Sequence, residues 1–188
     1  MYNKKAQGAL EFLMTYGWAF LVILIMIGAL AYFGVLNPTK FLPERCTFGT
    51  QFLCKDYLLA TGPGATSNLV LRLQNNVGSG IAIDVGTGGV TVSNSEGFSC
   101  TTTGMTITDA QGLPLPMDTI VPTNPLVSDG QVFLVTFPAG ACTGGGFQSA
   151  GGSKFKTDVE LYYYDTRSGA AFSHTIKGEL FATVEEFT

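Results

Sequence analysis

The chain has 188 residues, of which 46% are hydrophobic and only 13% charged, and it carries a formal net charge of −4 at pH 7. An acidic balance of this kind argues against nucleic acid as an electrostatic partner. The length suits one N-terminal helix plus one globular domain of about 140 residues, which is large enough to have its own core. The 24 glycines and the scarcity of helix-forming runs after Leu36 favour a β-rich domain.

The first predicted element is a helix formed by the charge-free apolar run from Phe12 to Leu36. As a helix this run is about 38 Å long, and the hydrocarbon core of a bilayer is about 30 Å thick. The run is apolar on every face, so its surroundings must be lipid or other helices like itself. We expect the helix to occupy residues 7–37 and to end before Pro38, which disfavours helical conformation in the residue that precedes it.

Two ordinary explanations of the apolar run are a signal peptide and a single-span anchor. The run is long and lacks an obvious small-residue cleavage pattern, which makes a simple signal peptide the weaker explanation. An anchor fits better, because Lys4 and Lys5 would hold a short N-terminus in the cytoplasm. Glu11 is badly placed for a mere anchor, because a charge at the membrane end of an apolar helix costs free energy unless it snorkels or finds a partner.

The residues around Glu11 resemble a known family motif, and this resemblance implies a partner for the Glu11 carboxylate. From Lys4 the chain reads KKAQGALEFL, which resembles the class III signal sequence of archaeal type IV pilins. In that family a prepilin peptidase in the membrane removes a short basic leader and leaves the apolar helix attached. The resemblance implies a leader of residues 1–6 ending in Ala6, with Gln7 as the first mature residue and Glu11 as the glutamate at mature position five. It also implies that Glu11 meets the new amine of Gln7 on a neighbouring subunit during assembly.

The leader departs from the family pattern in one respect, because many leaders end in glycine and this one ends in Ala6. Cleavage after Gly8 would place Glu11 at mature position three, so we expect cleavage after Ala6. An archaellin fits less well, because that subfamily usually lacks the Gln-x-x-x-Glu arrangement. Loss of Lys4 and Lys5 would leave eight basic against fourteen acidic residues, a net charge of −6.

All four cysteines follow the helix, on the side predicted to face outward. An even number in an extracellular segment indicates two disulfides, although four cysteines allow three pairings. We favour Cys46 with Cys54, which would pin the neck after the helix, and Cys100 with Cys142, which would close a long loop. A metal site is disfavoured, because no two cysteines have C-x-x-C spacing.

The remaining chain predicts a β-sandwich. After a neck and first strand over 39–59, alternation and β-prone composition separated by turn residues predict about eight strands, at Leu69–Gln74, Ile81–Val85, Val90–Ser93, Met105–Thr108, Val132–Phe137, Thr157–Tyr164, Ala171–Ile176 and Glu179–Val184. Leu69, Leu71 and Leu73 are expected to face one way and Val70, Arg72 and Gln74 the other, as in a half-buried strand, and Val159, Leu161 and Tyr163 are expected to point inward. The segments 110–129 and 140–153 are expected to be surface connections. The predicted fold class is α+β, with an antiparallel, immunoglobulin-like sandwich over 38–188.

No catalytic or metal-binding group is expected. The one histidine, His174, follows Ser173 on a predicted strand, and neighbouring strand residues point to opposite faces, which opposes a catalytic pair. Asp109, Asp118 and Asp129 are spaced too widely for a recognised calcium loop and are expected to be solvated loop residues. We therefore expect neither an enzyme, nor a cofactor, nor a metal.

Three functions are compared on these grounds. The resemblance implies a pilin that waits in the cytoplasmic membrane, meets the prepilin peptidase and a pilus assembly platform with its ATPase, and forms a helical homopolymer on the cell surface that serves adhesion. The alternative is a single-span surface protein whose leader is never cut and whose β domain binds a ligand or another cell-surface protein. A membrane-tethered enzyme is the weakest of the three, for want of a catalytic constellation.

Overall fold

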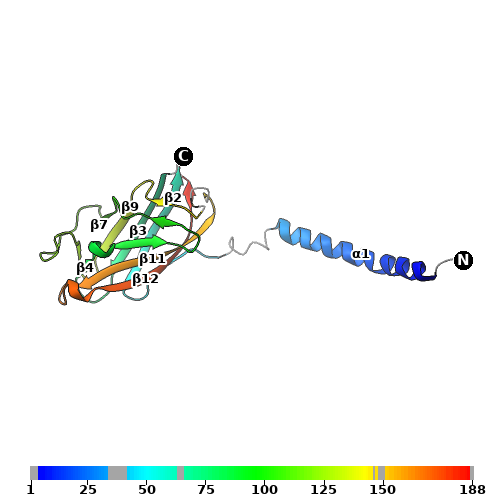
Figure 1. Cartoon of the computed structure of the whole chain (residues 1–188), viewed down its shortest axis with the longest axis horizontal. Helices are drawn as coiled ribbons and strands as arrows, with labels where there is room; N and C mark the ends of the chain where they lie inside the picture. The colour runs from blue at the N-terminus through cyan, green and yellow to red at the C-terminus, as the bar shows by residue number, and fades with distance from the viewer. Residues whose placement is uncertain (1–3, 34–41, 63–65, 146, 148–150, 187–188) are drawn as a thin grey trace. The chain divides into compact units, whose positions relative to one another are not determined.

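The chain divides into two compact units, residues 1–43 and 44–188. The computed structural model describes residues 4–33, 42–62, 66–145, 147 and 151–186. The first unit contains one helix, α1 (Lys4–Tyr32), and the second is a strand-rich body (Figure 1). The predicted α+β class is confirmed at this level. The predicted leader boundary after Ala6 falls inside α1, and the predicted domain limit at residue 37 lies outside the described residues.

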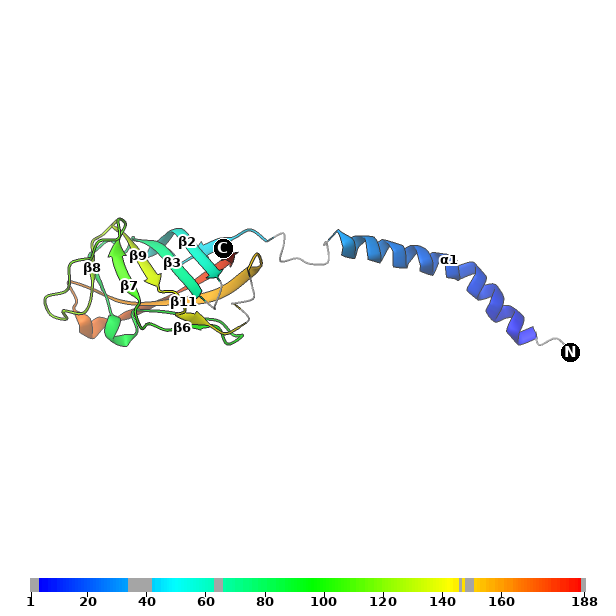
Figure 2. The same cartoon turned by 90° about the horizontal axis from the view of Figure 1, so that it is seen from above.

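α1 begins three residues before the predicted start at Gln7. Lys4, Lys5 and Ala6 are all good helix formers, so nothing in this segment opposes helical conformation. The described helix ends at Tyr32, and the predicted last turn, residues 34–37, is outside the described part. Figure 2 shows that α1 is bent. The Thr15 hydroxyl donates to the carbonyl oxygen of Glu11 at 2.7 Å, a local bond of the type that bends helices.

The described strands of the body form two sheets. An eight-stranded sheet follows the order β1 (Arg45–Thr47), β12 (His174–Thr183), β11 (Lys154–Asp165), β5 (Val90–Ser93), β6 (Ser99–Cys100) and β10 (Cys142–Thr143), with β4 (Ile81–Ile83) paired to β11 and β8 (Leu126–Val127) paired to β4. A five-stranded sheet follows the order β13 (Glu185–Glu186), β2 (Phe52–Gly62), β3 (Thr66–Asn75), β9 (Val132–Phe137) and β7 (Thr106–Asp109). Two short 3-10 turns, η2 (Val85–Thr87) and η4 (Ala170–Phe172), connect strands.

Both sheets contribute to one hydrophobic core. Leu69, Leu71 and Leu73 on β3 are completely buried, as the alternation predicts, and Val159 and Leu161 supply the core from β11 of the other sheet. Alternate residues of each strand thus point between the sheets, which is the packing of a β-sandwich.

One strand pairing departs from the predicted antiparallel arrangement. β13 pairs in parallel with β2, with Glu185 opposite Ala60. The chain leaves β12 in the eight-stranded sheet, passes through the buried Val184 and joins the edge of the five-stranded sheet. Because β13 reaches this sheet from β12 of the other sheet and not through a hairpin from β2, it can pair with β2 in parallel.

The two predicted strands Ala171–Ile176 and Glu179–Val184 are wrong as separate elements. The structure has a 3-10 turn over 170–172 and then one continuous strand, β12, through Gly178. Gly178 interrupts nothing, because the ring of Phe48 lies against its backbone where a side chain would otherwise project. The glycine therefore marks a close approach within the sheet, which is a known role of glycine in strands.

The two predicted surface connections are only partly on the surface. The segment 110–129 contains β8, and Leu115 and Asn124 within it are buried. In the segment 140–153, β10 pairs with β6, and Phe147 is completely buried against Phe98 and Phe155. Likewise the predicted neck and first strand contains two strands, β1 and β2.

Candidate functional site: the N-terminal helix and the outer faces of the body

The described side chains of α1 are exposed around the whole helix. Large apolar residues such as Trp18, Phe20 and Ile25 each have more than 60% of their surface open to solvent. Monomeric soluble proteins rarely expose contiguous apolar patches larger than a few hundred Å², and larger patches mark protein or membrane contacts. The segment Met14–Tyr32 is long and apolar enough to cross a membrane.

Glu11 stands at the N-terminal edge of this apolar surface. Its side chain is exposed and takes part in none of the ion pairs found within the described residues. After Glu11, no other charged residue occurs up to the end of α1. The helix therefore presents one carboxylate at the start of an apolar surface, and burying that charge in lipid or among like helices costs free energy unless it reaches the interface, is protonated or meets a cation.

The predicted processing residues, Ala6 and Gln7, lie in the first turns of α1. Gln7 precedes Glu11 by four residues, so the two positions fall on the same side of the helix. The side chains of residues 4–10 are outside the described part of the structure. The helical backbone of Ala6, Gln7 and Glu11 is therefore described, and the contact between Glu11 and the amine of Gln7 stays a prediction.

The chain enters the β body through a hydrogen-bonded carboxylate. Glu44 accepts hydrogen bonds from the Tyr57 hydroxyl on β2 at 3.0 Å, from the Thr183 amide on β12 at 3.3 Å and from the Thr183 hydroxyl. These donors belong to different sheets. Glu44 thus connects the beginning of the body to both layers of the sandwich.

The same contacts shift two pKa values in opposite directions. The hydrogen bond from the Thr183 hydroxyl, followed by that from Tyr57, lowers the pKa of Glu44 below its usual value of 4.5. Burial, together with the bond to Glu44, raises the pKa of Tyr57 to about 12. The pair therefore stays a charged acceptor and a neutral donor across the neutral range.

Two disulfides have the pairing favoured from sequence. Cys46–Cys54 joins β1 of the eight-stranded sheet to β2 of the five-stranded sheet. Cys100–Cys142 joins β6 to β10, where the two residues are direct partners across the strands. The first closes a loop with a sequence separation of 8 and the second one with a separation of 42. By loop-closure entropy the second stabilises the body by about 4 kcal/mol and the first by nearer 2.5 kcal/mol.

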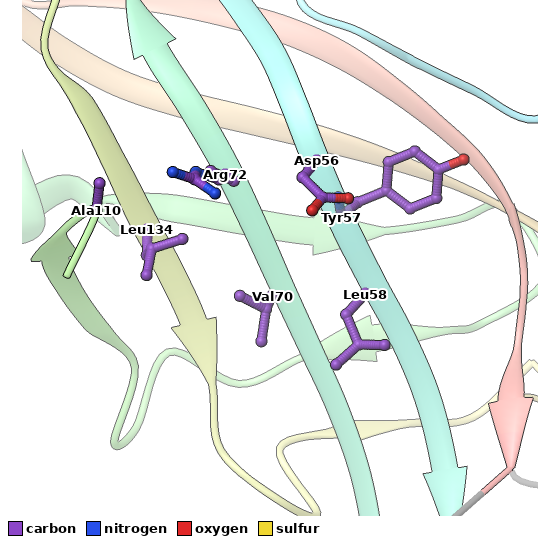
Figure 3. Close-up of a pocket in the computed structure, with 7 residues that line it drawn as sticks. All are labelled: Asp56, Tyr57, Leu58, Val70, Arg72, Ala110 and Leu134. Carbon is purple, nitrogen blue, oxygen red and sulfur yellow. The ribbon is translucent and has the colours of Figure 1, made fainter. Parts of the chain in front are cut away.

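The outer face of the five-stranded sheet contains a hollow of about 210 Å³. Figure 3 shows its lining side chains spread over neighbouring strands, with Leu58 from β2, Val70 from β3 and Leu134 from β9. Arg72 follows on β3, directly opposite Asp56 on β2 and Leu134 on β9. The hollow therefore combines aliphatic side chains with one guanidinium group, and the Asp56 carboxylate and the Tyr57 side chain line it as well.

The residues considered for catalysis or calcium binding make contacts with neighbouring groups of the fold. His174 is exposed at the start of β12, with its ring centroid 5.6 Å from that of Tyr163. Asp109 accepts amide hydrogen bonds within its own loop, Asp118 accepts from the Tyr164 hydroxyl, and Asp129 accepts from the Gly78 amide. Among the residues that the structure describes, no three His, Cys, Asp or Glu side chains gather where a metal ion could bind.

Comparison with protein-family models and with curated proteins finds no match to this chain. Sequence reasoning missed the Glu44 contacts and the hollow around Arg72, because both depend on which strands lie side by side. The alternation of Val70, Arg72 and Gln74 indicates an outward face but does not say which side chains of other strands join it.

Proposed function

We propose that the chain is the structural subunit of an extracellular filament similar to archaeal type IV pili, assembled through α1. The observation that carries the proposal is the combination of a helix with exposed apolar side chains on all sides and one isolated carboxylate, Glu11. Helices of this kind exchange lipid for like neighbours at little hydrophobic cost. A cation on the neighbour, the amine of Gln7 after cleavage, would then select one axial register over others.

The body fits the outer layer of such a filament. Two disulfides and a two-sheet core give it durability outside the cell. The immunoglobulin-like description is part of this proposal and is supported by the two sheets that share one core. Adhesion at the cell surface, the prepilin peptidase, the assembly platform and the ATPase are carried by the resemblance of residues 4–13, and neither enzymatic activity nor a nucleic-acid partner is proposed.

The first experiment determines the N-terminal peptide and the intact mass of the protein in material sheared from cells. A chain beginning at Gln7 in sedimentable filaments supports the proposal. A chain that retains Lys4 and Lys5 and stays in the membrane fraction overturns it in favour of a membrane-anchored surface protein.

A matched pair of variants then tests the role of the carboxylate. Glu11→Ala should leave the chain in the membrane at its normal level and reduce filament yield at least tenfold, because the register-selecting charge is lost. Thr15→Ala, one turn further along the same helix, removes a hydroxyl that bonds only to the local backbone and should assemble normally. Equal filament yields for the two variants would contradict the proposed role of Glu11.

A further inference from the structure

The two outer faces of the body differ sharply in charge. On the eight-stranded sheet, Glu179 pairs with Arg45 and with Lys156, the latter at 2.7 Å, and Glu160 pairs with Lys177 at 2.6 Å. These ion pairs connect neighbouring strands across the sheet and suit a face that stays in water. No comparable ladder exists on the outer face of the five-stranded sheet within the described residues.

On the five-stranded sheet the outer face is aliphatic instead. Leu58 lies directly opposite Val70, and Leu134 is directly opposite Arg72. These three aliphatic side chains line one hollow together with the Arg72 guanidinium group and with Asp56 of the neighbouring strand. Within the described residues Arg72 forms no ion pair. A hollow that combines half-buried aliphatic side chains with a guanidinium group outside any of these ion pairs suits an apolar, acidic partner.

A loop of the same body offers that chemistry. Three of the six large apolar side chains that the described body exposes lie in one loop: Leu113, Met117 and Ile120, which are 61%, 49% and 76% exposed. Asp118 lies between them and accepts hydrogen bonds from the Tyr164 hydroxyl and the Ile120 amide. Asp118 is therefore an anionic group within an apolar loop, opposite in charge to Arg72.

The loop is held in place before any contact is made. Bridges join Thr108 to Pro114 and Met117 to Pro125, and the Asp118 amide donates to the Asn124 carbonyl at 2.9 Å. A preformed loop loses little conformational freedom on binding, which favours its use as a contact surface.

We propose that the outer face of the five-stranded sheet around Arg72 docks the 113–120 loop of a second copy of this chain. The contact places Leu113 and Ile120 against Leu58, Val70 and Leu134 and brings a carboxylate to the guanidinium group. The two surfaces are different parts of the chain, so the contact is head-to-tail, and contacts of this type build open helical arrays when they do not close into a ring. The inference deepens the proposed filament function and rests on it.

Cysteine cross-linking in sheared filaments of the full chain tests the contact. All native cysteines are paired in disulfides, so introduced cysteines are the free thiols. With a short bifunctional thiol reagent, Val70→Cys combined with Ile120→Cys should give a ladder of multimers, because each chain contributes one thiol to each of two contacts. Either variant alone should remain monomeric. The matched control combines Ile120→Cys with Thr175→Cys, an exposed position on the outer face of the eight-stranded sheet, and should give no ladder.

Charge reversal provides a second measurement. Arg72→Glu should lower filament yield at least tenfold, whereas Thr175→Glu should leave it unchanged. Dimers from Val70→Cys alone would overturn the inference in favour of a face-to-face contact. Normal filaments without the ladder would overturn it and leave the proposed function intact. If the unaltered chain forms no filaments, the proposed function fails. The same cross-linking is then done in the membrane fraction, where a multimer ladder supports the contact between copies and its absence overturns the contact.

Discussion

Gly178 on β12 gives the sharpest test of how the body is packed. A Cβ atom built on this glycine would lie 2.5, 2.6 and 2.8 Å from three ring atoms of Phe48, whose side chain is 1% exposed. Gly178→Ala must therefore displace a buried aromatic ring. Overpacking of this kind costs about 1–3 kcal/mol, and replacing glycine in a permitted conformation returns about 0.4–1 kcal/mol through the unfolded chain. We expect a net destabilisation of about 1–2 kcal/mol.

Thermal unfolding of the full chain in detergent micelles measures this cost. Near-ultraviolet circular dichroism suits the body, because the one tryptophan, Trp18, lies in α1 and its fluorescence would not report on the sheets. A loss of 1 kcal/mol lowers Tm by about 2–4 °C for a chain of this size. The control is Gly86→Ala, an exposed position where a Cβ would meet only the end of the Asp84 side chain at 3.4 Å, and its Tm should be unchanged or slightly raised.

A double-mutant cycle isolates the contact. Once Phe48→Ala has removed the ring, Gly178→Ala should cost nothing further, which gives a coupling energy of about 1–2 kcal/mol. A Gly178→Ala variant as stable as the parent chain, or one that loses the same Tm in both backgrounds, would refute the argument that the Phe48 ring requires glycine beneath it.

Three further outcomes follow from the body. Replacing Cys100 and Cys142 together by serine should destabilise it by about 4 kcal/mol, read from urea unfolding with the other disulfide intact. Asn75→Leu leaves three buried or half-buried carbonyls without their side-chain donor, so a loss of at least about 2 kcal/mol is expected in the same assay. Hydrogen bonds lower the pKa of Glu44 below 4.5, so its stabilisation is complete above about pH 4.5 and is lost as pH falls through the lowered value. The stability difference between the parent chain and Glu44→Gln should therefore shrink below pH 4.5, and a pH-independent difference would contradict this.

Local periodicity was sufficient to predict much of the fold. The uninterrupted apolar run predicts α1 because no other pattern is apolar on all sides over such a length. The alternation of Leu69, Leu71 and Leu73 predicts a half-buried strand, and these three side chains are completely buried. Each of these features depends on residues that are close in sequence.

Features that depend on tertiary contacts could not be predicted in this way. The two predicted strands on either side of Gly178 are one strand in the structure, because the sequence does not reveal that Phe48, 130 positions earlier, lies over this glycine. Phe147 stands among glycines and looks like a loop residue, and it is buried because Phe98 and Phe155 come from distant strands to meet it. The aliphatic face around Arg72 has the same origin, since its members come from three strands.

The candidate site also contains both kinds of feature, those that depend on nearby residues and those that depend on tertiary contacts. Ala6, Gln7 and Glu11 were found from a short local pattern, and their proposed roles depend on a neighbouring subunit that no single chain contains. The Glu44 contacts at the start of the body could have been found only with knowledge that Tyr57 and Thr183 are neighbours in space.

The entrance of the body also determines how it would respond to a pulling force applied from its N-terminal side. Tension reaching Glu44 passes along β1, which pairs with β12 over only three residues and would peel away alone. The Cys46–Cys54 bond diverts the load to β2, which pairs with β3 over most of its length. The residues between the two cysteines then stay slack, and the force acts along the longest pairing of the five-stranded sheet, where the hydrogen bonds are loaded together and not one after another.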